Sequence, residues 1–428
     1  MRSESAAIWG LWFYLWQSEI EFLMIGSQLS EGFGPFLLLA DHLTKYSSLL
    51  DSSHLHIVSF DVPFPVDYGG VIDVFFKIKA LSEAGIKIHL HCFQYGRKAA
   101  PELNELCEVI HYYPRKKIYT GLVSRVPYIV GSRINPDLLE RLSSDSHPIL
   151  FEGLHTCAYL DHPLLAGKIK AVRMHNVEWQ YYRGLFDHST ETLKSIYYAV
   201  ESKRLQRYES VLVHANHIFA ISKTETEYLE SRYPQTSLIF PFHGVASRSA
   251  KPGFGSYMLY HGNLSVPENE EAVDWLIQNV KPTADFPLLI AGKKPGAKMK
   301  AAITGLSGFE LIENPSGTQM DALIAGAHIH ILPAFQSTGV KLKLVKSLFQ
   351  GRFVLTNPQM VEGTGLESVC IIFKRARDMG NQIEILKLQS FTEEEIARRK
   401  ALLSGFDDEK GAEAIIQVLF PQKTQVTE

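Results

Sequence analysis

Short apolar runs alternate with amphipathic segments along most of this chain of 428 residues. The apolar run at 55–60 predicts a buried strand. Apolar residues at helical spacing from 71 to 81 predict a helix that stops at Gly85, and the run at 86–93 predicts the next strand. A strand, a helix and a second strand in this order are typical of a parallel sheet.

The same pattern continues in two series. The first series predicts a helix at 223–233 and further strands at 149–151, 170–174, 217–221 and 238–242. The second series predicts strands at 257–261, 288–291, 310–312, 328–332 and 353–356, and helices at 269–280, 320–327 and 392–420. We therefore expect an α/β protein with two strand–helix halves of similar size.

A stretch rich in glycine, proline and small polar residues separates the two series, and we interpret 246–255 as a linker. The first domain then spans 54–245 and the second spans 256–420, followed by a polar tail at 421–428. Ligand sites are expected at the carboxyl ends of the strands. A cleft between two such domains suits a reaction that joins two substrates.

Residues 1–53 precede the first predicted strand, and we interpret them as an N-terminal extension that is poorly ordered. They contain the aromatic run IWGLWFYLW at 8–16, which is too short to span a bilayer. No small-residue cleavage site follows it, which argues against a signal peptide. The alternative for this run is an aromatic anchor at a membrane interface.

Composition and charge are those of an ordinary globular protein, with 21% charged residues and a net charge of −3. This balance does not favour nucleic acid as a partner. The four cysteines show no CxxC spacing and predict reduced thiols in a cytoplasmic protein. The sequence contains neither HExxH nor Asp-x-Asp, and its 17 histidines are scattered. No metal site and no cofactor are therefore predicted.

The segment from 333 to 344 carries the strongest functional signal. A predicted strand turns through Ser-Thr-Gly into a helix whose first turn contains Lys341 and Lys343 and no acid. Lysine there opposes the helix macrodipole by about 0.3–1 kcal/mol. A bound anion on the free backbone amides would explain the arrangement. We interpret Thr338, Gly339, Lys341 and Lys343 as a phosphate site; the alternative is two solvated lysines on a surface helix.

Two loops of the first half are further candidates. Gly69 and Gly70 precede a predicted helix and would let the backbone approach a ligand, or else serve a tight turn. His175 lies in the segment MHNVEW, where a strand ends. It could contact a sugar hydroxyl or move a proton, or be a loop histidine bonded to backbone.

Three loops of the second half point to the same edge as the phosphate site. Gly262 and Asn263 end one predicted strand, and Lys293 follows the next. Glu362 lies in a later turn and could bond a ribose or sugar hydroxyl. The alternative for each of these loops is a plain turn or helix cap. The prediction of a ligand-binding site therefore depends on all of them lying at the same edge of the sheet.

Four segments together resemble the glycosyltransferases of the GT-B fold, specifically the group 1/family 4-like enzymes. The first is SFDVPFP at 59–65 with Gly69 and Gly70, and the second is HNVEWQYYRGL at 175–185. The third is HGNLSVPENEEAVDWL at 261–276, and the fourth is LPAFQSTGVKLKLVKSLFQGRFVLTN at 332–357. The likeness covers about 54–420, and the order of the four motifs makes it specific.

The resemblance implies two Rossmann-like domains with parallel sheets facing across a cleft. It implies a nucleoside-diphosphate sugar donor held mainly by the second domain and a glycan or lipid-linked acceptor on the first. It implies a metal-independent hexosyltransferase of polysaccharide biosynthesis, in the cytoplasm or peripheral at the inner membrane face. The match makes His175 and Lys341 catalytic residues. The donor-binding residues on the match are Gly69, Gly70, Gly262, Asn263, Lys293, Thr338, Gly339, Lys343 and Glu362.

One departure from the family pattern concerns its two glutamates, which lie eight positions apart in the phosphate helix. Thr338 and Lys346 stand at the corresponding positions. Either Glu362 or another group holds the ribose, or the donor is held differently, or activity is lost. A catalytically inactive GT-B module that binds a glycan, nucleotide or partner protein is therefore the alternative. An epimerase or phosphorylase would need a carboxylate or cofactor-lysine constellation that the sequence does not show.

Overall fold

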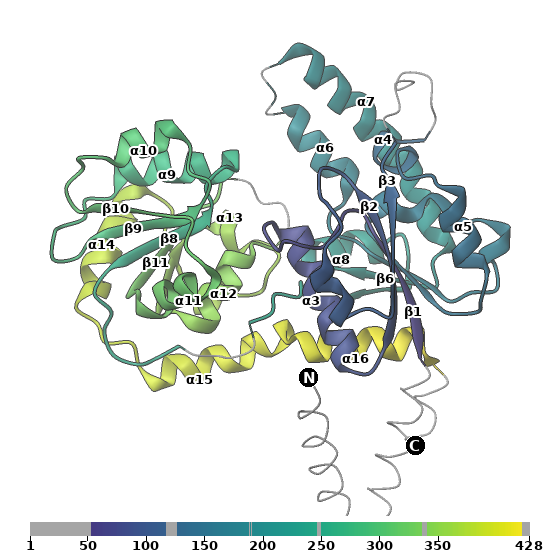
Figure 1. Ribbon diagram of the computed structural model, residues 1–428. Helices are drawn as coiled ribbons and strands as arrows, with labels where there is room; N and C mark the ends of the chain where they lie inside the picture. The colour runs from purple at the N-terminus through teal and green to yellow at the C-terminus, as the bar shows by residue number, and fades with distance from the viewer. Residues whose placement is uncertain are drawn as a thin grey trace, which may run out of the picture. The chain divides into compact units, whose positions relative to one another are not determined.

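The computed structural model describes residues 53–116, 126–187, 189, 191–245, 250–335 and 340–421. The strands in these residues form two sheets, and within each sheet neighbouring strands pair in parallel (Figure 1). The α/β prediction with two parallel sheets is confirmed. The predicted extension before residue 53, Thr338, Gly339 and most of the polar tail lie outside the described residues.

The first sheet has seven strands in the order β3-β2-β1-β4-β5-β6-β7. Its strands are β1 (His54–Ser59), β2 (Lys87–Gln94), β3 (Val109–Pro114), β4 (Ile149–Glu152), β5 (Lys170–Arg173), β6 (His217–Ala220) and β7 (Thr236–Leu238). The strand order reverses between β1 and β4, which makes their carboxyl ends a switch point where ligands bind in open α/β sheets.

Six α-helices accompany this sheet in the described part of the first half. They are α3 (Gly69–Glu83), α4 (Tyr128–Gly131), α5 (Pro136–Ser143), α6 (Glu178–Asp187), α7 (Thr192–Tyr208) and α8 (Lys223–Glu230). Short 3-10 helices lie at Pro101–Glu105, Leu154–Tyr159, Pro163–Leu165 and Glu209–His214. Helices α6 and α7 pack against each other, and β3, α6 and α7 have no counterpart among the elements predicted from the sequence.

The second sheet has six strands in the order β10-β9-β8-β11-β12-β13. They are β8 (Met258–Asn263), β9 (Leu288–Lys293), β10 (Phe309–Glu313), β11 (Ile329–Leu332), β12 (Phe353–Thr356) and β13 (Ile371–Ile372). Its helices are α9 (Pro267–Asn279), α10 (Ala297–Ile303), α11 (Gly317–Gly326), α12 (Leu342–Gln350), α13 (Pro358–Val361), α14 (Ala376–Lys387) and α15 (Glu393–Leu402), with a 3-10 turn at Glu367–Val369.

The C-terminal helical segment consists of two α-helices. A 3-10 turn (Leu403–Phe406) separates α15 from α16 (Asp408–Leu419). Asp407 caps α16 by accepting from the backbone N–H groups of Glu409 and Lys410. Helix α16 packs on α3, next to the first sheet. The sequence-based limits of the two domains remain a prediction, but the last helix lies with the first half.

One predicted strand is wrong in its limits. The prediction places it at 238–242, whereas β7 ends at Leu238. Beyond this point the backbone N–H of Phe242 donates to the Asp73 carboxylate, and the carbonyls of Ile239 and Phe240 accept from Arg173. The segment therefore leaves the sheet because side chains, not a neighbouring strand, satisfy its backbone groups.

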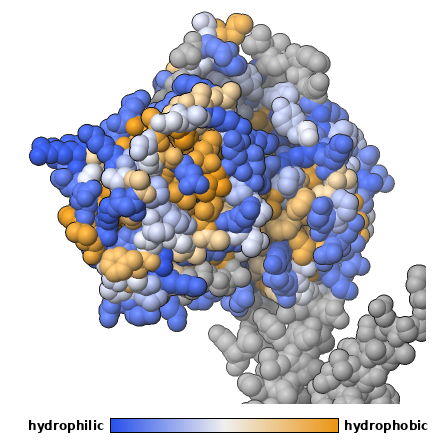
Figure 2. Space-filling model, turned by 60° about the vertical axis from the view of Figure 1, so that its left-hand side comes forward, coloured by the Kyte–Doolittle hydropathy of each residue, from blue (hydrophilic) through white to orange (hydrophobic). Residues whose placement is uncertain are grey.

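Both sheets are buried by the helices on their faces, which explains the continuous apolar runs of the strands. All residues of β4, β11 and β12 are buried. Polar residues cover most of the face shown in Figure 2, and apolar residues show through in a central area. Among the described residues, no helix combines the length and the apolar character that crossing a bilayer requires.

Candidate functional site

A pocket of about 450 Å³ lies at the carboxyl end of the first sheet. Phe60 and Asp61 line it directly after β1, and His175 and Asn176 line it directly after β5. The segment Val340–Leu342, which leads into α12, lines it as well. The pocket therefore takes residues from both halves of the fold, at the edge where parallel sheets bind ligands.

Four of the predicted site residues line this one pocket: Gly69, Gly70, His175 and Lys341. Neither glycine has a positive φ, so the tight-turn alternative has no support. A Cβ on Gly70 would lie 2.9 Å from the ring of Phe60, whereas a Cβ on Gly69 would meet nothing within 4 Å. Gly70 is thus needed for packing, and Gly69 leaves open space beside the pocket.

A buried network of charges forms the floor of the pocket. The Asp73 carboxylate on α3 accepts hydrogen bonds from Arg173 Nη2 at 3.0 Å and from Lys77 Nζ at 3.0 Å. Lys77 Nζ also donates to Glu152 Oε2 at 2.9 Å. All four side chains are buried. Burial alone would raise the pKa of Asp73, but Arg173 and Lys77 outweigh it and hold that pKa below its ordinary value.

His175 is part of the same network. Its Nε2 lies 2.8 Å from Glu152 Oε2, and its Nδ1 lies 3.6 Å from Asp73 Oδ2. The ring of Phe60 approaches it edge-on, with 5.2 Å between the centroids. The alternative of a loop histidine bonded to backbone is therefore wrong: carboxylates on β4 and α3 hold the ring and fix its orientation.

Asp73, Glu152 and His175 bring their ligand atoms close enough together for a metal ion. However, the ammonium of Lys77 already lies 3.0 Å from Asp73 and 2.9 Å from Glu152. A cationic side chain thus fills the place that a metal would take between the two carboxylates. These residues fit a fixed ion network better than a metal centre.

Two polar atoms in the pocket wall, Glu178 Oε1 and His155 Nδ1, have no hydrogen-bond partner among the described residues. They lie 3.8 Å apart. Burial raises the pKa of Glu178 to about 8 and holds the pKa of His155 well below its usual range. At neutral pH the pocket therefore presents a protonated carboxyl group and a neutral imidazole, a donor and an acceptor suited to hydroxyl groups.

The two predicted lysines of α12 differ in their surroundings. Lys341 lines the pocket, and its Nζ lies 3.9 Å from Glu268 Oε2. Lys343 does not line it, and its Nζ instead donates to Tyr260 Oη at 3.0 Å and Asn269 Oδ1 at 2.5 Å. Burial lowers the pKa of both lysines, that of Lys343 to about 7. The alternative of two solvated surface lysines is therefore wrong.

Comparison with known proteins identifies the fold. No family model matches the sequence. A Klebsiella pneumoniae protein described as an uncharacterized 44.6 kDa protein in the cps region is 26% identical over 334 residues, which cover 72% of this chain and 84% of that protein. A solved structure of TarM superposes with a TM-score of 0.60 at 10% identity, over 86% of this chain and 99% of that chain.

Two further solved structures agree. HepE from Anabaena, in complex with UDP and glucose, has a TM-score of 0.58 at 9% identity over 86% of this chain and 99% of that chain. A glycosyltransferase from Rickettsia africae has a TM-score of 0.58 at 12% identity over 87% of this chain and 99% of that chain. The chain has the GT-B fold. The resemblance of the four sequence segments to GT-B glycosyltransferases is confirmed at the level of the fold.

Four predicted donor residues of this GT-B chain lie away from the described pocket: Gly262, Asn263, Lys293 and Glu362. A Cβ on Gly292 would overlap the carbonyl of Gly262, so close strand pairing explains these glycines. The Asn263 carbonyl accepts from Asn269 Nδ2 at 2.8 Å. Lys293 and Glu362 are exposed. The donor-binding roles of these four residues stay a prediction.

Sequence reasoning missed two arginines of the GT-B pocket, Arg115 and Arg133. Arg133 donates to the carbonyl of Phe60 at 2.9 Å, and burial lowers its pKa to about 9. Arg115 lies over the ring of Tyr95, 4.2 Å from the centroid. Neither residue belongs to a motif, so the fold alone brings these cations to the end of β1.

Lys346 marks the departure from the GT-B family pattern. Its Nζ lies 2.7 Å from Asp321 Oδ1 on α11, and it does not line the pocket. The position of the usual second glutamate is therefore used for an ion pair between two helices. Thr338, at the position of the first glutamate, lies outside the described residues.

Proposed function

We propose that this chain is a metal-independent glycosyltransferase that moves a sugar from a nucleoside diphosphate to an acceptor hydroxyl. The observation that carries the proposal is the pocket that joins Gly69 and His175 of the first half to Lys341 of the second. HepE, which has the same fold, is described in complex with UDP and with UDP-glucose. UDP-glucose is therefore the first donor to test.

In the proposed reaction, the bond between the anomeric carbon and the phosphate oxygen breaks, and negative charge builds on the leaving diphosphate. Lys341 is placed to neutralise this charge from the start of α12. On the opposite side of the pocket, the open space beside Gly69 leaves room for the diphosphate. A fixed cation in a site shielded from water stabilises such a charge more strongly than water does.

The first half would bind the acceptor and orient the transferred sugar. Glu178 and His155 offer a proton donor and an acceptor to hydroxyl groups of a glycan or lipid-linked acceptor. Both ring nitrogens of His175 face carboxylates. We therefore assign His175 to contact with the transferred sugar rather than to carrying a proton.

The experiment is a donor screen on the full chain. UDP- and GDP-sugars are incubated with the protein in EDTA, and sugar release is followed by mass spectrometry. We expect one nucleotide to raise the melting temperature and its sugar to be released without added metal. Lys341→Ala should abolish most of the release, whereas Lys298→Ala, on an exposed face of α10, should not. Activity that survives fully in Lys341→Ala would contradict the phosphate assignment.

A second candidate, an inactive GT-B module, is favoured by one observation. Lys346 pairs with Asp321 at the position where relatives carry a glutamate that contacts the donor. A module of this kind would be stabilised by a nucleotide or glycan and would release no sugar from any donor. The donor screen separates the two candidates, because only the enzyme gives both stabilisation and release.

A further inference from the structure

Histidines gather at the amino end of the first sheet, away from the pocket. The parallel register places His56 of β1 opposite His89 of β2, and His91 of β2 opposite His111 of β3. His54 opens β1. Side chains two residues apart in a strand share a face, so pairing collects histidines that the sequence shows as scattered. The expectation of scattered histidines without a site therefore needs revision at this sheet edge.

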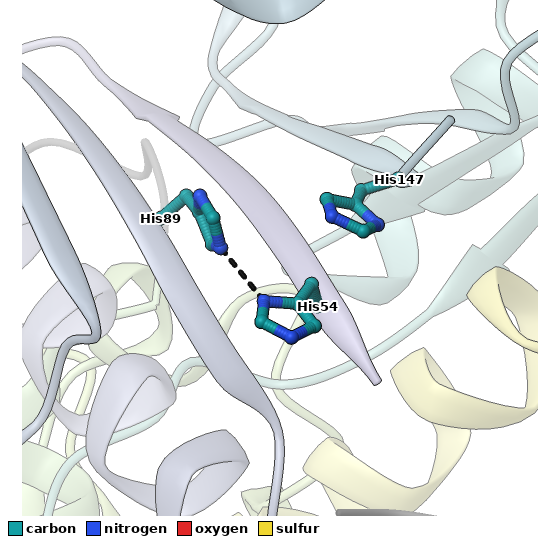
Figure 3. Close-up of side chains that lie close together, drawn as sticks. All are labelled: His54, His89 and His147. Atoms are coloured by element: carbon teal, nitrogen blue, oxygen red, sulfur yellow. Dashed lines mark hydrogen bonds between the residues drawn. The ribbon is translucent and has the colours of Figure 1, made fainter. Parts of the chain in front are cut away.

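Two of these imidazoles, those of His54 and His89, lie with the imidazole of His147 within reach of one ion. His54 Nδ1 lies 2.8 Å from His89 Nε2, and the His54 and His147 rings stack with centroids 4.8 Å apart. One ligand atom from each of the three lies within 4.8 Å of the others. Figure 3 shows the three rings together near the start of β1, with His147 turned toward the other two. All three residues are half-buried, so solvent ions can reach them.

We propose that His54, His89 and His147 bind a divalent transition metal ion, with Zn²⁺ as the best fit. Three imidazole nitrogens and one water are a common tetrahedral set for zinc. Zinc–nitrogen bonds of about 2.0–2.1 Å place the nitrogens about 3.3 Å apart. His54 and His89 would move apart slightly, and His147 would move inward on its loop. The side-chain motion needed is small.

The surroundings suit a cation. The backbone N–H of His147 donates to Asp145 Oδ1 at 2.9 Å, which fixes the loop that carries the third ligand. Lys168 opposes a cation here, but its ammonium is paired with Asp145 at 2.8 Å.

Deeper in the sheet, a chain of hydrogen bonds holds the neighbouring histidines. His56 Nε2 lies 3.0 Å from Asp145 Oδ2, and His56 Nδ1 lies 2.9 Å from His91 Nε2. His91 Nδ1 continues to Tyr113 Oη at 2.9 Å. These partners engage both ring nitrogens of His56 and of His91, so neither inner imidazole supplies a ligand atom.

The histidine site is separate from the pocket at the carboxyl end of the first sheet. His54 begins β1, whereas Phe60, just past its end, lines the pocket. Six residues of strand at about 3.3 Å each put roughly 20 Å between them. A bound ion would tie β1 and β2 to the loop before β4, so its effect is on stability rather than on sugar transfer.

The test uses the full chain without an affinity tag, freed of metal with EDTA and then dialysed. ZnCl₂ is titrated by calorimetry, and melting curves are recorded with and without zinc. We expect one ion per chain and a melting temperature that rises with zinc concentration, because the ion binds only the folded state. A Co²⁺ titration followed by visible absorption reports the coordination geometry directly.

His89→Gln and His147→Gln should each weaken zinc binding about tenfold or more. His147 lies in a loop, so its variant tests the site even where His89→Gln disturbs the sheet. His217→Gln, on β6 beside Ser237, is the matched control and should keep wild-type affinity. Absence of zinc binding overturns the proposal. So does stoichiometric binding that both variants keep and that His175→Gln, in the pocket cluster, removes.

Discussion

The two walls of the pocket carry charge in opposite ways. In the first half, Asp73 and Glu152 are matched by Lys77 and Arg173 at 2.9–3.0 Å, deep in the fold. In the second half, the Lys341 ammonium faces Glu268 at 3.9 Å. Lys343, which does not line the pocket, donates to the uncharged Tyr260 and Asn269. The first wall therefore pairs its charges at hydrogen-bond distance, whereas the second would face the diphosphate of the proposed donor.

Removing a charge from the buried network of the first wall should have the largest effect, and that effect is on stability. Asp73→Asn removes one carboxylate charge from beside Lys77 and Arg173, both buried. Removing one partner of a buried ion network costs about 3–5 kcal/mol. We expect the free energy of unfolding, measured with urea, to fall by that amount. Asp274→Asn, which breaks the surface pair with Lys298, is the control and should leave the midpoint in place.

Removing the Lys341 cation from the second wall should affect activity rather than folding. Lys341→Ala removes the cation that faces the proposed diphosphate. Loss of one such electrostatic contact costs about 10²–10³ in kcat, so we expect kcat/KM for the donor to fall by that order. The unfolding midpoint should change little. An equal loss in stability and activity would show that the lysine only supports the fold.

A third experiment uses the pH dependence of stability to test the raised pKa of Glu178, which lines the first wall. Burial raises the pKa of Glu178 from 4.5 to about 8. Between these values Glu178 holds a proton in the folded chain that it has lost in the unfolded chain, so the contribution of this group to stability falls as pH rises, by at most about 1.4 kcal/mol per unit.

Glu178→Gln should flatten this decline in urea unfolding measured from pH 5 to 8. The exposed variant Glu230→Gln should keep it. Glu225, whose pKa burial raises to about 7, leaves a smaller slope in both proteins. A wild-type slope in Glu178→Gln would mean that this carboxyl group ionises in the folded chain.

The smallest expected effect concerns Lys343. Burial lowers its pKa to about 7, and a nucleotide diphosphate nearby would favour its protonated form. Binding should take up a proton, so UDP affinity should fall several-fold between pH 6 and 8. Calorimetry in buffers of different ionisation enthalpy measures the uptake. The terminal phosphate of UDP itself ionises at about pH 6, so the variant is the reference. Lys343→Met should take up fewer protons on binding than the wild type, and equal uptake in both proteins would remove Lys343 from the donor site.

The fold was largely predictable because parallel strands buried on both faces leave apolar runs that periodicity detects. β11 and β12 are such runs, and their limits lie within one residue of the prediction. β3 was missed because only its first two residues, Val109 and Ile110, are aliphatic, and the strand is only partly buried. The end of β7 was misplaced because a distant carboxylate, Asp73, captures the following backbone.

The candidate site was predictable where a motif lies at a strand end. His175 follows β5, whereas Gly69, Gly70 and Lys341 lie where the helices after β1 and β11 begin, and all four share the pocket. The network under them was not predictable, because Asp73, Lys77 and Arg173 lie inside ordinary helix and strand patterns. Asp73 and Arg173, for example, are 100 residues apart in the sequence. Long-range pairing of this kind leaves no local signal.

Helix α16 sets a limit on how the chain can be divided. It follows the last element of the second sheet, yet it packs on α3, and Asp408 accepts from the backbone N–H of Gly244 at 2.8 Å. A fragment that stops near residue 245 would leave that flank of α3 bare. Chimeras that exchange donor-binding halves between relatives must therefore keep residues 408–419 with the recipient's first half. The modular unit is therefore discontinuous in sequence, because its last helix follows the whole second sheet along the chain.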